Sequence, residues 1–571
     1  MFQTPLPPTS AGLAEASWPE IAAWYDDLAG AELTAATRDD WLAAWSRLDE
    51  LVTEAASLAM IAYTSDTTDK AKEAAHLRFS TEILPQLEEK EVALAKRFVA
   101  IGTDRDDLQT ALRRFRTAIE LFREANVPLT AEAEGLAARY QQVTGGMTAE
   151  WQGDRVPLPR LAPFLKVADR GVREAAWRAG VAPYVAARDE LAGLFDRMVE
   201  LRGEMARNAG FADFRDYTFV AKGRFEYTPA DTERLHDAIE ATVVPAVERV
   251  MAHRRERLEL AALRPWDTAV DPRQREATAP YRDIADLEER AAAIFERIDP
   301  TLGGQFRTMM TEGLLDLEAR PGKAPGGYCD TLHARGRPFV FMNAAGVAED
   351  VMTLLHEAGH CFHAFASHAR PLIWQRHPGA ESAELASMSM ELLAGPHLAR
   401  PTGYYEAPDA VAARLEHLED LLVALAHIAS VDAFQSWIYT DPAGRDAAAR
   451  DAAWLRFRER FERGVDWTGL EAERVARWYR QLHIFLYPFY YIEYGIAQIG
   501  ALQVWRNARR DPEGAVAAYR RFLALGATRP LPELYRAAGV ELSFEAGLLG
   551  ELVTMVEEEM EVLRGSLAGV G

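Results

Sequence analysis

Residues 350–363 read DVMTLLHEAGHCFH, and this stretch decides both the local fold and the chemistry that we expect. Asp350 is suited to cap a helix that enters the segment. On that helix His356 and His360 lie four residues apart and project from one face, where both imidazoles reach one metal ion at about 2.0 to 2.1 Å. Glu357 lies about one residue's rotation away and is suited to hold a water molecule rather than the metal. The pattern predicts the metal-binding helix of a zinc hydrolase.

A catalytic zinc needs three protein ligands and an open position, so one ligand must come from elsewhere. The metzincin spacing would place a glycine and a third histidine farther along the same stretch, but His363 and Ala366 stand there, which excludes that class. His363 is about 10.5 Å along the helix axis from His356. We therefore expect His363 beside the ligands or in the core, and not on the metal.

The next helical segment, residues 381–391 (ESAELASMSME), offers three carboxylates. Glu384 and Glu391 are seven residues apart and would share a face of the helix. We expect Glu384 to be the third metal ligand and Glu391 to orient one of the histidines.

A third segment, residues 483–500 (HIFLYPFYYIEYGIAQIG), is dense in tyrosine. Tyrosine and histidine are the donors that a hydrolase working at neutral pH would aim at a developing oxyanion. Tyr490 and Tyr494 are four residues apart and would face one way on a helix. The alternative is an aromatic helix of the core.

The rest of the sequence predicts a mostly α fold with one small sheet. Apolar residues at three-and-four spacing indicate helix after helix over residues 11–300, with no repeat and no long linker. Residues 321–343 (PGKAPGGYCDTLHARGRPFVFMN) instead combine Gly/Pro punctuation with two strand-like stretches around a polar turn, which indicates a β-hairpin. Helical periodicity returns from residue 350. We place the domain boundary near residue 200, with an N-terminal helical lobe over 1–200 and a catalytic helical domain over 201–571.

One strand of this hairpin suggests a contact with substrate. The stretch 338–343 would pair with an extended peptide by β-augmentation, because backbone groups give affinity that does not depend on sequence. Phe341, Asn343 and the adjoining Ala344 are then the expected substrate contacts. The alternative is an ordinary buried strand.

Composition narrows the classes of partner. The 571 residues are 49% hydrophobic and 26% charged, and 64 Lys and Arg against 87 Asp and Glu give a net charge of −23. This charge disfavours binding to nucleic acid or to anionic membranes, and nowhere do about 18 apolar residues run unbroken. Only Cys329 and Cys361 are present, which is typical of a reducing cytoplasm.

These three segments together resemble the thimet oligopeptidase and oligoendopeptidase F family of zinc metallopeptidases, most closely the oligoendopeptidase F branch. The matching residues are the block 356–360 with His363, the block 384–391, and His483 with the block 488–495. Specific motifs carry the resemblance over about residues 321–505. Before these residues the chain resembles the family only in its general helical pattern.

The resemblance implies a fold, a cofactor and roles for residues. The family is almost wholly helical, with two lobes around a deep channel that admits short unstructured peptides. One zinc per chain would be bound by His356, His360 and Glu384, with Glu357 as the general base. The resemblance also implies that His483, Tyr490 and Tyr494 contact substrate and stabilise the tetrahedral intermediate. Tyr491 is the alternative if one of these two tyrosines does not have this role.

The expected activity is internal cleavage of short peptides by a monomer or small homo-oligomer. Two alternatives stay open at this point. A zinc carboxypeptidase would use the same chemistry to trim single residues from a C-terminus. A non-catalytic peptide-binding protein would keep the fold without turnover, although all four residues of the expected metal site are present.

Overall fold

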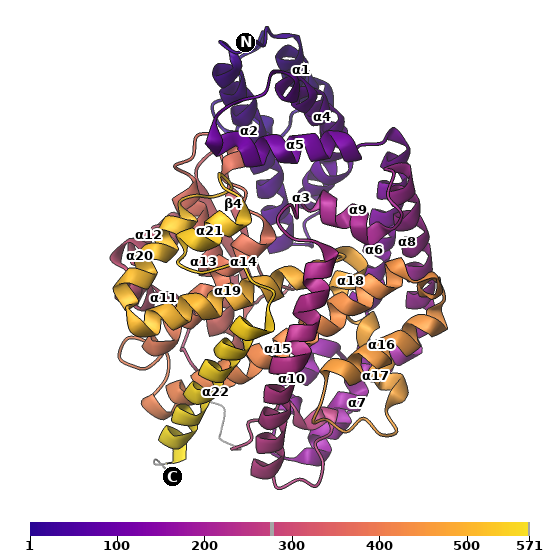
Figure 1. Ribbon diagram of the computed structural model, residues 1–571, viewed down its shortest axis with the longest axis vertical. Coiled ribbons are helices and arrows are strands. Elements are labelled where there is room, and N and C mark those ends of the chain that lie inside the picture. The colour runs from indigo at the N-terminus through magenta and orange to yellow at the C-terminus, as the bar shows by residue number, and fades with distance from the viewer. Residues whose placement is uncertain (274–278, 569–571) are drawn as a thin grey trace.

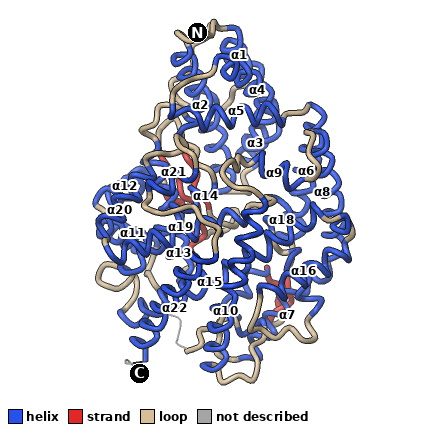
Figure 2. The backbone as a smooth tube through the Cα atoms, in the orientation of Figure 1, coloured by secondary structure: helices blue, strands red, loops and turns tan. Residues whose placement is uncertain are grey.

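Helices form most of the chain, which confirms the mostly α fold expected from the sequence (Figures 1 and 2). The computed structural model describes residues 1–273 and 279–568. In the N-terminal half the elements are α1 (Trp18–Gly30), α2 (Arg38–Ser65), α3 (Lys70–Leu77), α4 (Leu84–Ile101), α5 (Gln109–Leu121), α6 (Val127–Gly145), β1 (Thr148–Trp151), β2 (Asp154–Pro157), α7 (Arg170–Ala186), α8 (Arg188–Asn208), α9 (Phe214–Ala221) and α10 (Pro229–Arg257).

The C-terminal half contains a second small sheet and the longest helices. Its elements are α11 (Ile284–Ile298), α12 (Pro300–Glu312), β3 (Leu315–Glu318), β4 (Tyr328–Leu332), β5 (Arg337–Ala344), α13 (Ala348–Ser367), α14 (Ala380–Ala394), α15 (Ala407–Thr440), α16 (Ala447–Phe461), α17 (Glu471–Tyr479), α18 (Leu482–Leu486), α19 (Tyr491–Arg510), α20 (Pro512–Leu523), α21 (Leu531–Ala537) and α22 (Ala546–Ala568).

The ends of α12 illustrate how local sequence sets these boundaries. The side chain of Asp299 accepts hydrogen bonds from the backbone N–H groups of Thr301 and Leu302, and Pro300 occupies the first helical position, where no N–H is needed. Gly313 ends the helix with a φ of 67°, a conformation that glycine adopts without steric cost.

The hydrophobic core is divided among three main clusters. Residues 13–112 form one with Leu372, and the helices that carry most of it, α1, α2, α4 and α5, lie at the top of Figure 1. A second joins residues 140–199 to residues 431–485, and the largest spans residues 61–563. The helices α6 to α8 thus pack against α15 to α18, far away in sequence. The domain boundary near residue 200 stays a prediction.

The hairpin expected over residues 321–343 is confirmed, but its strand β5 is not free to bind a peptide. β4 and β5 are antiparallel, with Tyr328 opposite Phe341. β3 pairs in parallel with the other edge of β5, so the strand order is β3-β5-β4. β4 pairs with residues 337–341 of β5 and β3 with residues 340–344. An extended substrate therefore cannot pair along the whole of residues 338–343 without displacing a neighbouring strand, and the structure does not support that expectation. The structure also contains a hairpin, β1-β2, that the sequence analysis did not predict.

The three expected substrate contacts on β5 have structural roles instead. Phe341 is fully buried and stacks on Tyr328 with ring centroids 4.9 Å apart. The Asn343 amide donates to the backbone oxygens of Ala324 and Gly326, and Ala344 lies opposite Glu318 in the sheet. These residues hold the loop and the sheet together.

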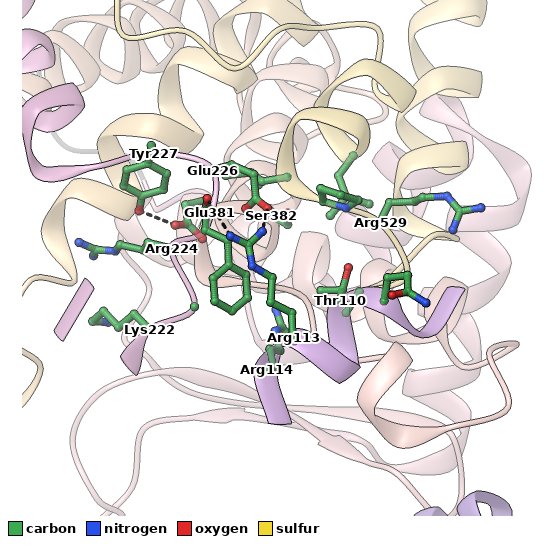
Figure 3. Close-up of a pocket in the computed structure, with 18 residues that line it drawn as sticks. Thr110, Arg113, Arg114, Lys222, Arg224, Glu226, Tyr227, Glu381, Ser382 and Arg529 are labelled. Atoms are coloured by element: carbon green, nitrogen blue, oxygen red, sulfur yellow. Dashed lines mark hydrogen bonds and ion pairs between the residues drawn. The ribbon is translucent and has the colours of Figure 1, made fainter. Parts of the chain in front are cut away.

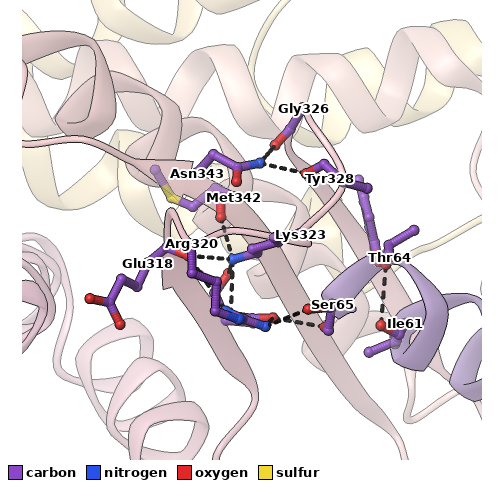
Figure 4. Close-up of polar contacts among 12 residues, drawn as sticks. Ile61, Thr64, Ser65, Glu318, Arg320, Lys323, Gly326, Tyr328, Met342 and Asn343 are labelled. Carbon is purple, nitrogen blue, oxygen red and sulfur yellow. Dashed lines mark hydrogen bonds and ion pairs between the residues drawn. The ribbon is translucent and has the colours of Figure 1, made fainter. Parts of the chain in front are cut away.

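A polar network joins this sheet to the N-terminal lobe (Figure 4). Lys323, whose side chain is fully buried, donates to a carboxylate oxygen and the backbone oxygen of Asp316 and to the backbone oxygens of Glu318 and Met342, at 2.6 to 2.9 Å. Asp316 also accepts from Ser65 at the end of α2, at 2.8 Å. The loop before β4 is thus fixed to both parts of the molecule.

We predict that Lys323→Met lowers the free energy of unfolding by at least about 3 kcal/mol, because it removes the donor to the backbone oxygens of Asp316, Glu318 and Met342 and the buried cation beside the Asp316 carboxylate. Thermal unfolding measures the loss. Arg320→Met is the matched control: Arg320 binds the same carboxylate but is 38% exposed, so its loss should cost about 1 kcal/mol or less. Equal effects of the two substitutions would contradict the role given to Lys323.

Helix α15 runs through the middle of the C-terminal half (Figure 1). Among the described residues it is the one helix long and apolar enough to cross a membrane, yet 72% of its most apolar window is buried inside the protein. It packs against α10, α16, α19 and α22. Its apolar character is explained by this place in the core.

Candidate metal centre

The centre is built where α13 meets α14. Gly359 of α13 faces the backbone of α14 so closely that a Cβ there would lie 2.5 Å from the Ser387 Cα and 2.7 Å from the Ala386 oxygen. Only glycine allows this approach. The contact brings one face of α13 against the α14 turn that carries Glu384.

The three expected metal ligands come together at this contact. The Glu384 Oε2 lies 3.3 Å from the His356 Nε2 and 3.6 Å from the His360 Nε2. The three ligand atoms lie within 4.8 Å of one another. Tetrahedral zinc with bonds of about 2.0 to 2.1 Å separates its ligands by about 3.3 Å. The donor set and its spacing fit such an ion.

Electrostatics also favour a cation here. Burial alone would raise the pKa of Glu384, but the hydrogen bond from His356 and the nearby His360 lower it to about 2. Burial lowers the pKa of His360 to about 4. Glu384 is therefore ionised and the His360 imidazole neutral, the protonation states that metal ligands require. Burial would lower the pKa of His356, but its hydrogen bonds to Glu384 and Glu391 raise it, so this ring must release a proton when a metal binds.

Glu391 holds His356 from behind, as expected from the sequence. The His356 Nδ1–H donates to one oxygen of Glu391 at 2.6 Å, which leaves Nε2 directed at the other ligands. The second oxygen accepts from the His417 Nε2 of α15 at 2.8 Å. Burial raises the pKa of Glu391, but these two hydrogen bonds outweigh it and lower the pKa to about 2.

His417 is a residue of this network that the sequence did not reveal. It lies on the long helix α15, which also carries His427, and no motif marks it. His236, by contrast, is a buried core histidine away from the metal centre, with its Nε2 2.9 Å from the Asp432 carboxylate.

Glu357 is suited to take up a proton. It is nine-tenths buried on α13 beside the ligands, and burial raises its pKa to about 7. A base with a pKa near the working pH is efficient in both directions of proton transfer. The position and the pKa support the role expected for it.

Glu381, the third carboxylate of its segment, belongs to another pocket. It accepts a hydrogen bond from the Tyr227 hydroxyl at 2.5 Å. Figure 3 shows it turned toward Tyr227 and Arg224, in a pocket also lined by Arg113. Of the three carboxylates, Glu384 and Glu391 are the two at the metal centre.

The tyrosine-rich segment is not one helix. α18 ends at Leu486 and α19 begins at Tyr491, and between them Phe489 has a φ of 63°. This left-handed conformation is rare outside glycine and is held by surrounding contacts. The Phe489 N–H donates to Gln435, and its carbonyl accepts from Arg224.

The break brings the aromatic side chains toward the metal ligands. The Tyr490 hydroxyl donates to the Glu384 Oε1 at 2.9 Å, and the Tyr490 and Tyr494 rings lie 5.0 Å apart. His483 lies between them and Tyr491, with ring centroids 5.9 Å from Tyr490, 6.1 Å from Tyr494 and 4.8 Å from Tyr491. Tyr491 donates to Gln481 instead, at 2.9 Å.

His363 lies in the core, one of its two expected places, and Asp350 caps the start of α13, as expected from the sequence. His363 packs against Phe522 of α20, and both its ring nitrogens lack a hydrogen-bond partner among the described residues. It is a core residue, because seven residues along α13 carry it past the ligands. Asp350 accepts from the N–H groups of residues 345–347 and from Tyr281, and so fixes the loop that leads into α13.

Comparison with known families agrees with this geometry. The model of Peptidase family M3 matches residues 164–554, more than half of the chain and the whole of the metal centre. The chain belongs to peptidase family M3. The resemblance stated from the three sequence blocks is thus confirmed.

Individual relatives are similar over different lengths. An oligoendopeptidase F homolog of Borreliella burgdorferi is 21% identical over 46% of this chain and 44% of its own length. The chain spans less than half the length of the curated relatives that it matches. A structure of Pz peptidase A with an inhibitor covers 98% of both chains at 25% identity and a TM-score of 0.87. A structure described as a candidate oligoendopeptidase F covers 96% of this chain and 97% of its own at 26% identity and 0.88.

We predict that Gly359→Ala weakens metal binding by about 10-fold or more, because the added methyl group pushes α14, and with it Glu384, away from the histidines. Zinc titration against a competing chelator measures the affinity. Gly304→Ala on α12 is the matched control, since a Cβ there meets nothing within 4 Å. Unchanged zinc affinity in Gly359→Ala would show that the helix contact does not set the ligand spacing.

Proposed function

We propose that this member of family M3 is a zinc-dependent metalloendopeptidase that hydrolyses internal bonds of short, unstructured peptides. The observation that carries the proposal is the approach of Glu384 to within 3.3 and 3.6 Å of the two histidines, with Glu357 beside them. His356, His360 and Glu384 would hold one zinc ion per chain. Zinc, when bound, polarises the scissile carbonyl and lowers the pKa of water toward about 7.

The residues around the metal site then have separate roles in hydrolysis. Glu357 takes a proton from the attacking water and passes it to the leaving amine. Glu391 keeps His356 in the tautomer whose Nε2 is free to bind metal. Attack by water requires no covalent intermediate with the enzyme.

The phenols and the imidazole of the broken segment support a role in the transition state. Tyr490 and Tyr494 carry pKa values raised by burial, so both hydroxyls stay protonated and can donate to a developing oxyanion. His483 is positioned to contact substrate. Burial lowers its pKa, which favours the neutral ring.

The size of the interior supports short peptides as substrates. A cavity of about 1030 Å³ is lined mostly by residues of α2, α4, α5, α6 and α9, and by residues between 373 and 380 that lead into α14. None of the three expected metal ligands lines it, but Lys222 of its wall lies 4.9 Å from the Tyr490 ring centroid. A space of this size takes an extended peptide and not a folded domain. The free thiols of Cys329 and Cys361, with sulfur atoms 3.5 Å apart, fit a cytoplasmic location, which we also propose.

Glu357→Gln should retain the metal and lose several orders of magnitude of turnover, because the amide cannot accept the proton. Mass spectrometry of a pool of short peptides checks this, with untreated protein, chelator-treated protein and the variant in parallel. Internal cleavage by the untreated protein alone supports the proposal. Stepwise loss of C-terminal residues would indicate a carboxypeptidase. If the zinc-loaded protein cleaves no peptide, the result would indicate a peptide-binding protein.

Tyr490→Phe and Tyr494→Phe should lower turnover more than metal content, by about 2.7 to 4 kcal/mol for whichever hydroxyl donates to the oxyanion. Steady-state rates and zinc analysis of the same samples separate the two effects. Tyr487→Phe is the matched control, because its side chain is 54% exposed and lies in the same segment. Normal turnover of both variants would favour the aromatic-core alternative.

A further inference from the structure

The loop between α9 and α10, residues 222–228, contacts the segment of the expected catalytic tyrosines, although it belongs to none of the three sequence blocks. Lys222 and Arg224 of this loop both bind the Glu493 Oε1 in the first turn of α19, at 3.2 and 2.8 Å. Glu493 is 2% exposed and the Arg224 side chain is fully buried. Two cations of the loop therefore meet one buried carboxylate of α19.

Arg224 also binds the backbone where the chain breaks between α18 and α19. Its Nη2 donates both to the Glu493 carboxylate and to the carbonyl of Phe489, the residue whose φ is 63°. Tyr490 follows directly. A left-handed conformation outside glycine persists only where neighbouring groups hold it. One guanidinium therefore fixes both sides of Tyr490, the strained residue before it and the helix after it.

Lys222 contacts Tyr490 itself. Its Nζ lies 4.9 Å from the centroid of the Tyr490 ring, within the range of a cation–π interaction. The hydroxyl of the same ring donates to the Glu384 Oε1 at 2.9 Å. The ring is thus held by a cation at its face and by an expected metal ligand at its hydroxyl.

The loop also binds α14, the helix that carries Glu384. The Tyr227 hydroxyl donates to Glu381, three residues before Glu384, and both side chains are buried (Figure 3). The Arg224 guanidinium carbon lies 5.7 Å from the Tyr227 ring centroid, so the two contacts belong to one packed group. Residues 222–227 therefore link α14 to the start of α19, and the distance between Glu384 and Tyr490 depends on this link.

Stability alone does not explain a charged group at this place. Burial of two charges costs free energy that a close ion pair returns only in part, and apolar side chains of similar size are often as stabilising. The Arg224 Nε and Nη1 and the Glu493 Oε2 have no hydrogen-bond partner among the described residues, so this pair is not fully compensated. What the pair supplies is direction, because its hydrogen bonds fix the Phe489 carbonyl relative to the first turn of α19.

We propose that Arg224 and Lys222 are positioning residues of the active site, which hold the Tyr490 hydroxyl where it can donate to the developing oxyanion. The proposal rests on the proposed peptidase function. Both residues act through Tyr490 and not on the metal, so their loss should slow turnover and leave zinc binding intact. The loop is thereby a fourth segment of the site, distant in sequence from the other three.

Steady-state rates on an internally quenched peptide test this in a double-mutant cycle. Arg224→Met should lower kcat about 100-fold, because a shift of about 1 Å in a catalytic group costs about that much, with KM within about threefold and zinc content unchanged. In the Tyr490→Phe background the same substitution should cost less than about threefold, since the hydroxyl that it misplaces is already gone. An equal fold-loss in both backgrounds would show that Arg224 does not act through Tyr490 and would overturn the proposal.

Lys222→Met should lower kcat about 10-fold, and Lys222→Arg, which keeps a cation over the ring, should restore it to within about threefold. A loss that the arginine does not restore would contradict the role of the cation. The Lys222 side chain is 24% exposed, so these two variants carry the test if Arg224→Met does not fold. Arg173→Met is the control and should keep normal kcat, because Arg173 is also buried and also binds one carboxylate and one backbone carbonyl, those of Asp267 and Trp266.

Amide hydrogen exchange gives a readout without turnover. In chelator-treated protein, Arg224→Met should speed the exchange of the amides of residues 489–493 by at least about 10-fold, and Arg173→Met should not. Unchanged exchange in Arg224→Met overturns the proposal even if the protein cleaves peptides. Faster exchange with no cleavage by the untreated protein would instead refute the peptidase function and leave the positioning of Tyr490 supported.

Discussion

Two helices can share one metal site only if they approach closely, and at Gly359 the backbone of α14 leaves no room for a side chain on α13. The two histidines are fixed relative to each other by the helix that carries both, whereas their distance to Glu384 depends on this contact. The loop network around Asp350 sets where α13 begins, and the buried Lys323 fixes the neighbouring sheet. The geometry of the site is therefore a property of packing across α13, α14 and the sheet.

Buried charge explains why the network extends to α15. Glu384 and Glu391 are both buried and both carry pKa values near 2, so each must be compensated inside the protein. A buried carboxylate that loses a partner becomes strongly destabilising. His356 faces both carboxylates, and His417 completes the set from α15. A cation at the three ligands would balance the charge that the histidines alone share between two carboxylates.

Much of the site could be predicted because its signals are local. The spacing of His356, Glu357 and His360 depends on one helix, and Glu384 and Glu391 follow from the face of the next. The β4-β5 hairpin could be predicted from its turn residues. The features that could not be predicted depend on contacts between residues distant in sequence. β5 is central because the four-residue strand β3 pairs with its other edge. Neither this pairing nor the contact of His417 on α15 with the metal centre can be predicted from the residues close to it in sequence.

The tyrosine segment shows the same limit at the level of the backbone. Its spacing suggested one helix, but Phe489 adopts a left-handed conformation that is held by Gln435 of α15 and by Arg224 of the loop between α9 and α10. Tyr490 and Tyr494 nevertheless lie together, as their spacing suggested. The reason is that Tyr490 directly precedes α19 and has helical backbone angles.

The most direct test of the account is a crystal structure of the zinc-loaded protein with an anomalous difference map at the zinc absorption edge. The account predicts one peak per chain, about 2.0 to 2.2 Å from the His356 Nε2, the His360 Nε2 and a Glu384 oxygen, with the Glu391 hydrogen bond to His356 retained. A peak bound by other side chains, such as the Cys329 and Cys361 thiols, or a peak that lacks Glu384, would contradict it.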